Sequence, residues 1–153
     1  MSLPTERTKS IFGEDVGAEF LTLYFRIGYP PLLIQHPFME THRLVLRGDL
    51  NHYGFLFGGR LLAWVDEASW IAASMDFPQS QLVTVAMDRV EFHHSVREGT
   101  ILRISCKQER EGTTSVTYAV EVYDERAGGG SIFSTNVTFV NVDGDGKKRA
   151  LRG

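Results

Sequence analysis

The second half of the chain alternates between apolar and polar residues. This alternation covers residues 102–107 and 116–122, and Val and Phe are frequent over 82–93 and 131–142. A period of two places the apolar side chains on one face of a sheet. We therefore expect four long antiparallel strands, with turns at Gly112-Thr113 and at Gly128-Gly129-Gly130.

A helix is predicted over residues 60–75, before these strands. Its apolar stripe steps by four, three, four and three residues: Leu61, Val65, Ala68, Ala72 and Met75. Further apolar residues lie off the stripe, which predicts a helix buried all round: Leu62, Trp64, Trp70 and Ile71. A short strand over 42–47 and a turn-rich segment over 48–59 precede this helix, and Pro78 marks its end. One buried helix and four strands favour an α+β fold in which an antiparallel sheet wraps around a central helix.

Residues 1–40 differ from the rest and are predicted to form an N-terminal extension to a domain over 41–153. Apolar residues at helical spacing indicate a short helix over 15–27: Val16, Phe20, Tyr24 and Ile27. Gly28 and Pro30-Pro31 would end it, and an extended arm would run through Pro37. Two interpretations stay open, an arm packed on the domain or on a neighbour and a lid over a binding site.

Composition narrows the class of protein. The 153 residues are 42% hydrophobic and 23% charged, as in a single globular domain, and the net charge of −3 gives no attraction to nucleic acid or anionic membranes. No stretch reaches the ~20 apolar residues of a membrane helix, and we expect neither a secretory signal nor a membrane partner. The single cysteine, Cys106, excludes an internal disulfide and predicts a buried, inert thiol in a reducing compartment such as the cytoplasm.

Two features of the predicted helix carry chemistry. Gly58 and Gly59 come at its start, where unpaired backbone N–H groups attract negative charge and a ligand can approach the backbone. Such donors can polarise a carbonyl oxygen during acyl transfer. Asp66 stands among apolar residues two turns later, where an unpaired carboxylate is costly to bury. The residues alone leave open a solvated edge position or a site carboxylate, with Glu67 as the rival about 100° around the helix.

The run over residues 51–67, N-x-x-G-x-x-F-G-G-x6-D-E, resembles the active-site segment of hotdog acyl-CoA thioesterases. The closest branch comprises the bacterial broad-specificity acyl-CoA hydrolases and their tandem-domain eukaryotic relatives. The resemblance covers roughly residues 42–151 and continues through Val83-Thr84-Val85-Ala86, Val90-Glu91-Phe92, Gly112-Thr113-Thr114-Ser115-Val116 and Asp145-Gly146-Lys147-Lys148-Arg149. It implies a hotdog fold and hydrolysis of acyl-CoA to a free acid and CoA. No cofactor is expected, because CoA belongs to the substrate.

The resemblance also implies roles for individual residues. Asp66 would be the general base or the nucleophile, Asn51 would position the water or the thioester, and Gly58-Gly59 would polarise the carbonyl. Contacts to the substrate are expected from seven residues: His52, Phe57, Glu67, Thr114, Ser115, Lys147 and Arg149. The chain departs from the pattern at His52-Tyr53 and at His93-His94-Ser95, which affects the expected substrate preference and CoA contacts.

Several alternatives stay open. His52 is either functional or a loop surface residue. The basic C-terminal cluster, which comprises Lys147, Lys148, Arg149 and Arg152, is either part of a solvated tail or a contact for CoA phosphates. A calcium loop over 141–152 is rejected, because Arg152 stands where the closing Glu belongs. A non-catalytic acyl-CoA-binding module and a hotdog dehydratase are the competing functions.

Spacing along the helix predicts the assembly. Asp66 lies seven residues after Gly59, which is about 10 Å along a helix. Two antiparallel helices would close that gap across a two-fold axis, so a homodimer with composite sites is expected, assembled further into tetramers or hexamers.

Overall fold

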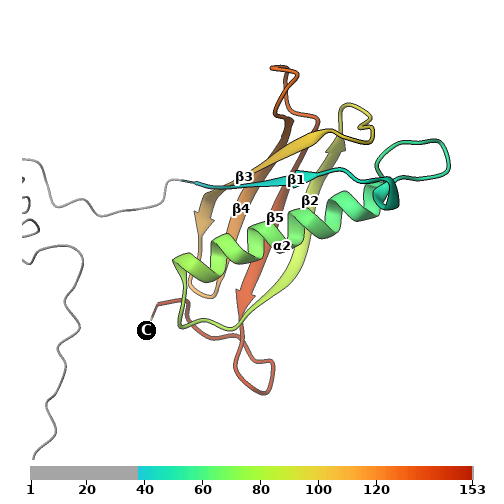
Figure 1. The fold of residues 1–153 in the computed structure, drawn as a ribbon. Coiled ribbons are helices and arrows are strands. Elements are labelled where there is room, and N and C mark those ends of the chain that lie inside the picture. The colour runs from blue at the N-terminus through green and yellow to red at the C-terminus, as the bar shows by residue number, and fades with distance from the viewer. Residues whose placement is uncertain (1–37, 153) are drawn as a thin grey trace, which may run out of the picture. The chain divides into compact units, whose positions relative to one another are not determined.

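A computed structural model describes residues 38–152, so the predicted helix over 15–27 and most of the N-terminal arm lie outside the described residues. Within them the chain forms a five-stranded sheet and one long helix (Figure 1). The elements in chain order are β1 (Met39–Leu44), the 3-10 helix η1 (Arg47–Asp49), α2 (Gly58–Asp76), β2 (Leu82–Phe92), β3 (Ile101–Glu111), β4 (Ser115–Asp124) and β5 (Phe133–Asn141). The predicted α+β class is confirmed. No helix in this part of the chain is long and apolar enough to span a membrane.

The strands lie in the order β1-β3-β4-β5-β2, and each neighbouring pair is antiparallel. The turn between β3 and β4 closes where expected, since the Gly112 N–H donates to the Ser115 carbonyl at 2.7 Å. β1 was predicted over 42–47 but runs from Met39 to Leu44. It ends earlier because the Asp49 carboxylate accepts the Leu46 N–H at 2.9 Å and caps η1 there.

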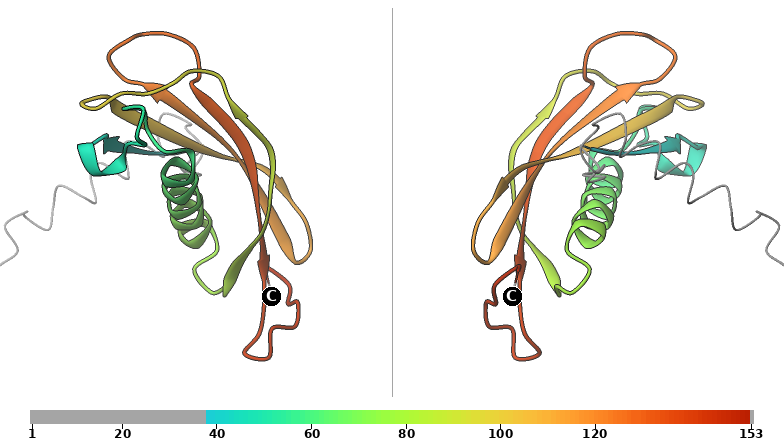
Figure 2. Two further views of the ribbon diagram at one scale, coloured as in Figure 1. Left: turned by 90° about the vertical axis from the view of Figure 1, so that its right-hand side faces the viewer. Right: turned by 90° about the vertical axis from the view of Figure 1, so that its left-hand side faces the viewer.

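The sheet curves around one side of α2 (Figure 2). The buried residues of the helix and of the strands form one hydrophobic core. The predicted stripe of α2 is buried at Leu61, Val65, Ala68 and Ala72. The alternating positions of the strands are buried as predicted: Leu102, Ile104, Cys106, Val116, Tyr118, Val120, Val122, Phe133, Val137 and Phe139. Period-two alternation therefore identified the inner face of the sheet correctly.

The prediction that α2 is buried all round is wrong for the described chain. Trp70 is 45% exposed, Ile71 40% and Met75 59%, so the last residue of the predicted stripe is open to solvent. β2 is an edge strand whose apolar side chains are also exposed: Val83, Val85, Val90 and Phe92. One sheet covers only one side of a helix, and large apolar side chains left exposed on a helix and an edge strand are typical of a surface that a partner covers.

Candidate functional site

Asp66 projects from α2 toward the edge strand β2. Its side chain is half-buried, and its Oδ1 accepts a hydrogen bond of 2.8 Å from the Thr84 hydroxyl. The register of β2 against β5 jumps between Thr84 and Ala86, which leaves Val85 as an extra residue. Bulges of this kind bend a strand and re-aim a neighbouring side chain. The sequence assigned no role to Thr84, since nothing in its pattern marks this bulge.

Asn51 organises the loop that leads into α2. Its Oδ1 accepts the backbone N–H groups of Tyr53 at 2.9 Å and Phe55 at 3.2 Å. Gly54 takes a φ of 80° inside this turn, a conformation that glycine adopts without strain. Because the side-chain oxygen Oδ1 of Asn51 already accepts these two hydrogen bonds, the side-chain NH₂ is the group left to contact a water or a thioester.

Gly58 and Gly59 are the first two residues of α2, as predicted. Their N–H groups precede the first helical hydrogen bonds, and neither has an acceptor within residues 38–152. An open pocket of about 360 Å³ borders Gly59 and Phe57. A Cβ at Gly59 would come within 3.0 Å of the Phe57 ring, so glycine keeps this approach open.

The two neighbouring carboxylates of α2 have different partners. Glu67 forms an ion pair with Arg43 of β1, whereas Asp66 contacts Thr84 of β2. Glu67, expected to contact substrate, is therefore engaged elsewhere in this chain. His52 is exposed and its ring centroid lies 3.8 Å from that of Tyr53, so the structure shows it on the loop surface.

The C-terminal segment 142–152 is folded rather than a solvated tail. Val142 bridges Lys148 after a turn in which the Asp143 carboxylate accepts the N–H groups of Asp145 and Lys147. Leu151 is only 7% exposed and belongs to the core. The four side chains of the basic cluster are exposed. Arg152 pairs with Glu111 at 2.7 Å, whereas the other three have no ion-pair partner among the described residues: Lys147, Lys148 and Arg149.

The predicted site residues fall into two groups at opposite ends of α2. Asn51, Gly58 and Gly59 lie at its start, where Gly58 faces the ring of Phe92. At the other end, Thr114 ends the turn before β4 and Ser115 is the first residue of β4, and the segment with Lys147 and Arg149 joins the same end of the sheet (Figure 1). α2 has 19 residues, so the groups are about 28 Å apart along its axis. Asp66 lies between them, and one chain does not bring the whole set together.

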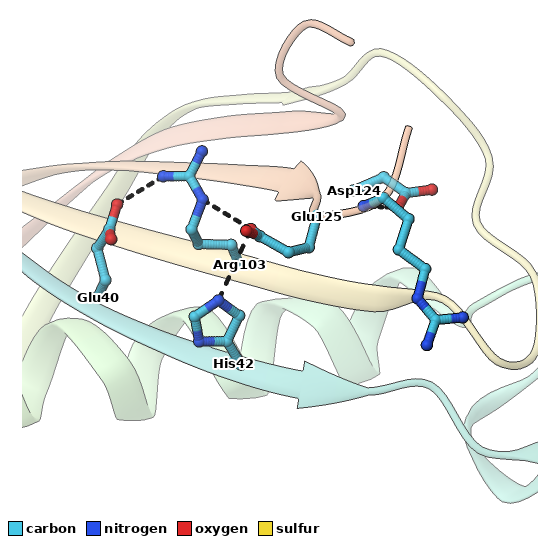
Figure 3. A network of polar contacts seen from close by, with 6 residues as sticks. Glu40, His42, Arg103, Asp124 and Glu125 are labelled. Atoms are coloured by element: carbon cyan, nitrogen blue, oxygen red, sulfur yellow. Dashed lines mark hydrogen bonds and ion pairs between the residues drawn. The ribbon is translucent and has the colours of Figure 1, made fainter. Parts of the chain in front are cut away.

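A separate polar network lies on the face of the sheet that points away from α2 (Figure 3). Arg103 of β3 donates to Glu40 at 2.5 Å and to Glu125 at 2.9 Å, and His42 Nε2 is 3.7 Å from Glu125. The hydrogen bond to Glu40 is the main reason that the pKa of Arg103 is raised. Alternation along β3 turns Arg103 away from Leu102 and Ile104, so this network is outside the candidate site.

Known proteins share both the sequence and the fold. The thioesterase superfamily matches residues 53–143. Acyl-CoA thioester hydrolase YciA of Escherichia coli is 31% identical over 114 residues, which cover 71% of this chain and 86% of that protein. Acyl-coenzyme A thioesterase 11 of mouse is 30% identical over 87 residues, which cover 57% of this chain but only 14% of the mouse protein.

Solved structures extend this similarity to three dimensions. An acyl-CoA hydrolase from Staphylococcus aureus, in complex with butyryl coenzyme A and coenzyme A, has 29% identity and a TM-score of 0.66, covering 74% of this chain and 68% of that one. A hexameric hotdog fold thioesterase of Campylobacter jejuni has 34% identity and a TM-score of 0.63, covering 72% of this chain and 86% of that one. The match over more than half of the sequence, together with the sheet wrapped around α2, places this chain in the thioesterase superfamily, with the hotdog fold.

Proposed function

We propose that this protein hydrolyses acyl-CoA thioesters to a free carboxylic acid and CoA. The observation that carries the proposal is the half-buried carboxylate of Asp66, which stands between Val65 and Glu67 on α2 and accepts a hydrogen bond from Thr84 of β2. Further support comes from the relatives, since the Escherichia coli protein is named an acyl-CoA thioester hydrolase and the Staphylococcus aureus enzyme is described with butyryl coenzyme A.

In the proposed reaction Asp66 acts as a general base, with direct nucleophilic attack as the alternative. The oxygen of a water forms a bond to the thioester carbonyl carbon while its proton passes to Asp66. The carbonyl oxygen becomes anionic and accepts hydrogen bonds from the N–H groups of Gly58 and Gly59. The oxyanion then re-forms the carbonyl as the C–S bond breaks, and the leaving thiolate takes the proton held by Asp66, which gives the free acid and CoA and restores the carboxylate.

We infer that the active unit is a homodimer with composite sites. One chain separates Asp66 from Gly59 by about 10 Å along α2. A second copy related by a two-fold axis, with its α2 antiparallel, would bring the partner copy's helix start toward Asp66. The exposed apolar side chains of α2 and the edge strand β2 provide an apolar surface for such a contact. The hexameric relatives support further assembly of dimers.

The basic C-terminal cluster is proposed to meet the phosphate groups of CoA. Arg152 of this cluster is paired with Glu111, but Lys147, Lys148 and Arg149 are exposed and have no ion-pair partner in the described part of the chain. Thr114 and Ser115 lie at the same end of the sheet. Exposed Lys and Arg side chains bind phosphate through charge-assisted hydrogen bonds. Because acyl-CoA is an intracellular metabolite class and Cys106 is a free thiol, we also propose a cytoplasmic location.

Steady-state release of free thiol tests the proposed activity. The purified full chain is supplied with saturated acyl-CoA substrates from short to long chain, and the thiol released is followed over time. Multiple turnovers on at least one chain length would support the hydrolase. A protein that binds acyl-CoA without releasing thiol would be a binding module, and one that eliminates water from a hydroxyacyl-CoA without releasing thiol would be a dehydratase.

A further inference from the structure

Asn141 ends β5 and is buried, with an exposed fraction of 2%. Its Oδ1 accepts the Gln81 N–H at 2.9 Å, and its Nδ2 donates to the Ala150 carbonyl at 2.7 Å. It shares the inner face of β5 with Val137 and Phe139, where apolar side chains are the rule. A buried amide at such a position is stable only because both of its ends are hydrogen-bonded.

The backbone of Asn141 makes two more contacts. Its N–H donates to the Thr114 carbonyl at 2.9 Å, and its carbonyl accepts the Arg149 N–H at 2.9 Å. One residue therefore joins three segments that are far apart in sequence, namely the loop after α2, the turn between β3 and β4, and the C-terminal segment. The last two segments carry the residues proposed to contact CoA.

The side-chain bond to Ala150 lies directly beside the basic cluster. Beyond it, the C-terminal segment is fixed by the Leu151 N–H, which donates to the Thr113 carbonyl at 2.9 Å, and by the Arg152 ion pair with Glu111 at 2.7 Å. Without the Asn141 amide, residues 147–150 would keep only backbone contacts to the sheet. The charges of Lys147 and Arg149 would then be held less firmly relative to Thr114.

We propose that Asn141 is a positioning residue for the nucleotide end of CoA. Its amide holds the C-terminal segment against the turn between β3 and β4, so that the basic cluster presents its charges to phosphate groups in a fixed arrangement. This inference rests on the proposed function, because it concerns the binding end of the same substrate. Asn141 itself does not touch the thioester.

The test compares two substitutions at Asn141 with a matched control. Asn141→Ala removes both side-chain bonds, and Asn141→Leu removes them while filling a similar volume with an apolar group. Asn136→Ala is the control, since Asn136 lies on the same strand and its side chain has no hydrogen bond within residues 38–152. Each protein is assayed on an acyl-CoA and on the N-acetylcysteamine thioester of the same acid, which lacks the nucleotide.

We expect Asn141→Ala to raise KM for acyl-CoA about tenfold, the factor typical of weakened charge-assisted contacts. The kcat should stay within about twofold, and kcat/KM for the short thioester should not change, because uniform binding of the nucleotide is what is lost. Asn136→Ala should match the parent on both substrates. A residue with a merely structural role would lower kcat/KM on both thioesters alike, and that result would overturn the inference.

Direct binding of CoA, measured by calorimetry, separates this inference from the proposed function. A parent that binds CoA but releases no thiol would refute the hydrolase, while the ratio of Kd between variant and parent would still decide the role of Asn141. An unchanged Kd and KM in both Asn141 variants would overturn the inference and leave the hydrolase intact. If Asn141→Ala does not fold, the decision rests on Asn141→Leu, which restores the buried volume.

Discussion

Asp66 and Glu67 are neighbours in sequence that differ in their surroundings. Asp66 is half-buried and faces Thr84 on the edge strand, whereas Glu67 is exposed and forms an ion pair with Arg43. A general base needs a fixed carboxylate with access to one water, and an exposed ion pair contributes little to either stability or catalysis. The environment of each side chain therefore favours Asp66.

Substitution of each carboxylate by its amide tests this difference. We expect Asp66→Asn to leave the fold intact and to lower kcat by at least ~100-fold, the low end for loss of a general base. Glu67→Gln serves as the matched control and should change kcat by less than about threefold. Thiol release gives the rates, and circular dichroism checks the fold. The reverse ranking would show that Glu67 is the reacting carboxylate.

Cys106 is expected to lower the stability of the protein as the pH becomes alkaline. Burial raises the pKa of its thiol to about 12, while the thiol of the unfolded chain ionises near its ordinary value of about 8.5. Below about pH 8.5 the thiol is protonated in both the folded and the unfolded chain, and its full contribution to stability is present. As the pH rises toward the folded-state pKa, the unfolded chain loses this proton first, and the contribution is lost. The free energy of unfolding should then fall by up to about 1.4 kcal/mol per pH unit above about pH 9.

Urea denaturation of the parent and of Cys106→Ala measures this effect. Between about pH 8 and pH 10 the variant should show a flatter dependence on pH, because it has no thiol to ionise. Tyr118 adds a similar loss only above about pH 10, where the hydroxyl of the unfolded chain ionises while burial and the hydrogen bond to Asp76 keep the pKa of the folded-state hydroxyl raised. Equal slopes in the two proteins over this range would rule out Cys106 as the source.

At the scale of single residues, the sequence predicted a helix start at Gly58-Gly59, and the structure confirms it. Asp66 was marked as unusual by its apolar neighbours, but its catalytic role is implied by the resemblance and stays a prediction. Thr84 could not be found in this way, because its contact to Asp66 depends on the extra residue at Val85 in β2. The two hydrogen bonds that Asn51 makes to its own loop were equally invisible, since they depend on the path of the backbone.

At the scale of elements, the start of α2 combines structural and chemical demands. Glycine weakens a helix, so a first turn with Gly58 and Gly59 gives up stability that alanine would provide. The exposed Phe57 ring can move away from a methyl group at position 59, so a substitution there need not disturb the fold. What a methyl group would obstruct is the approach of a ligand to the N–H groups.

Gly59→Ala should therefore separate stability from activity. We expect thermal stability to be unchanged or raised by up to about 0.5 kcal/mol, while kcat/KM falls at least ~10-fold because the oxyanion donors are obstructed. Gly129→Ala, in the turn between β4 and β5 and with nothing within 4 Å of a Cβ, is the control for the substitution itself. Unchanged kcat/KM in Gly59→Ala would remove the helix start from the mechanism.

The folded C-terminal segment calls for a change of side chains rather than a truncation. Removing residues 147–153 would also remove the buried Leu151 and the ion pair of Arg152 with Glu111. Replacement of Lys147 and Arg149 by Ala keeps these contacts. We expect KM for acyl-CoA to rise about tenfold with kcat nearly constant, and its dependence on salt to weaken. Lys107→Ala, on the outer face of β3, should change neither, and an unchanged KM in the double variant would remove this segment from CoA binding.

The helix and the strands were more predictable than the surfaces that cover them. Four strands and α2 follow from the periods of two and 3.6 residues, because burial against a common core produces both. The predicted range of β1, 42–47, was wrong, since the strand ends at Leu44 before the cap that Asp49 forms. The prediction that α2 is buried all round was also wrong, since Trp70, Ile71 and Met75 are exposed in the described chain. Their apolar character could be read from the sequence, but whether this chain or a partner covers them could not.

At the scale of the whole molecule, two independent features of the described chain favour a partner copy beside it. The proposed catalytic groups at the start of α2 and the proposed CoA-binding groups lie at opposite ends of a helix about 28 Å long. In addition, the edge strand β2 and the outer side of α2 expose large apolar side chains. A two-fold axis beside β2 would address both, because it covers these side chains and places opposite ends of two antiparallel helices together.

Subunit mixing tests this arrangement directly. Asp66→Asn and Asn51→Ala proteins should each be inactive, since every composite site of either homodimer carries one lesion. In a mixed dimer one site would combine both lesions and the other would combine Asp66 of one chain with the partner copy's intact Asn51. Refolding the two proteins together in equal amounts should therefore restore activity, to about one quarter of the parent value if chains pair at random and half of the dimers are mixed.

Distinct affinity tags allow the mixed dimers to be isolated and their formation to be verified. If isolated mixed dimers have no activity, each site belongs to a single chain, and the distance between Gly59 and Asp66 along α2 would have to be bridged by a movement within one subunit.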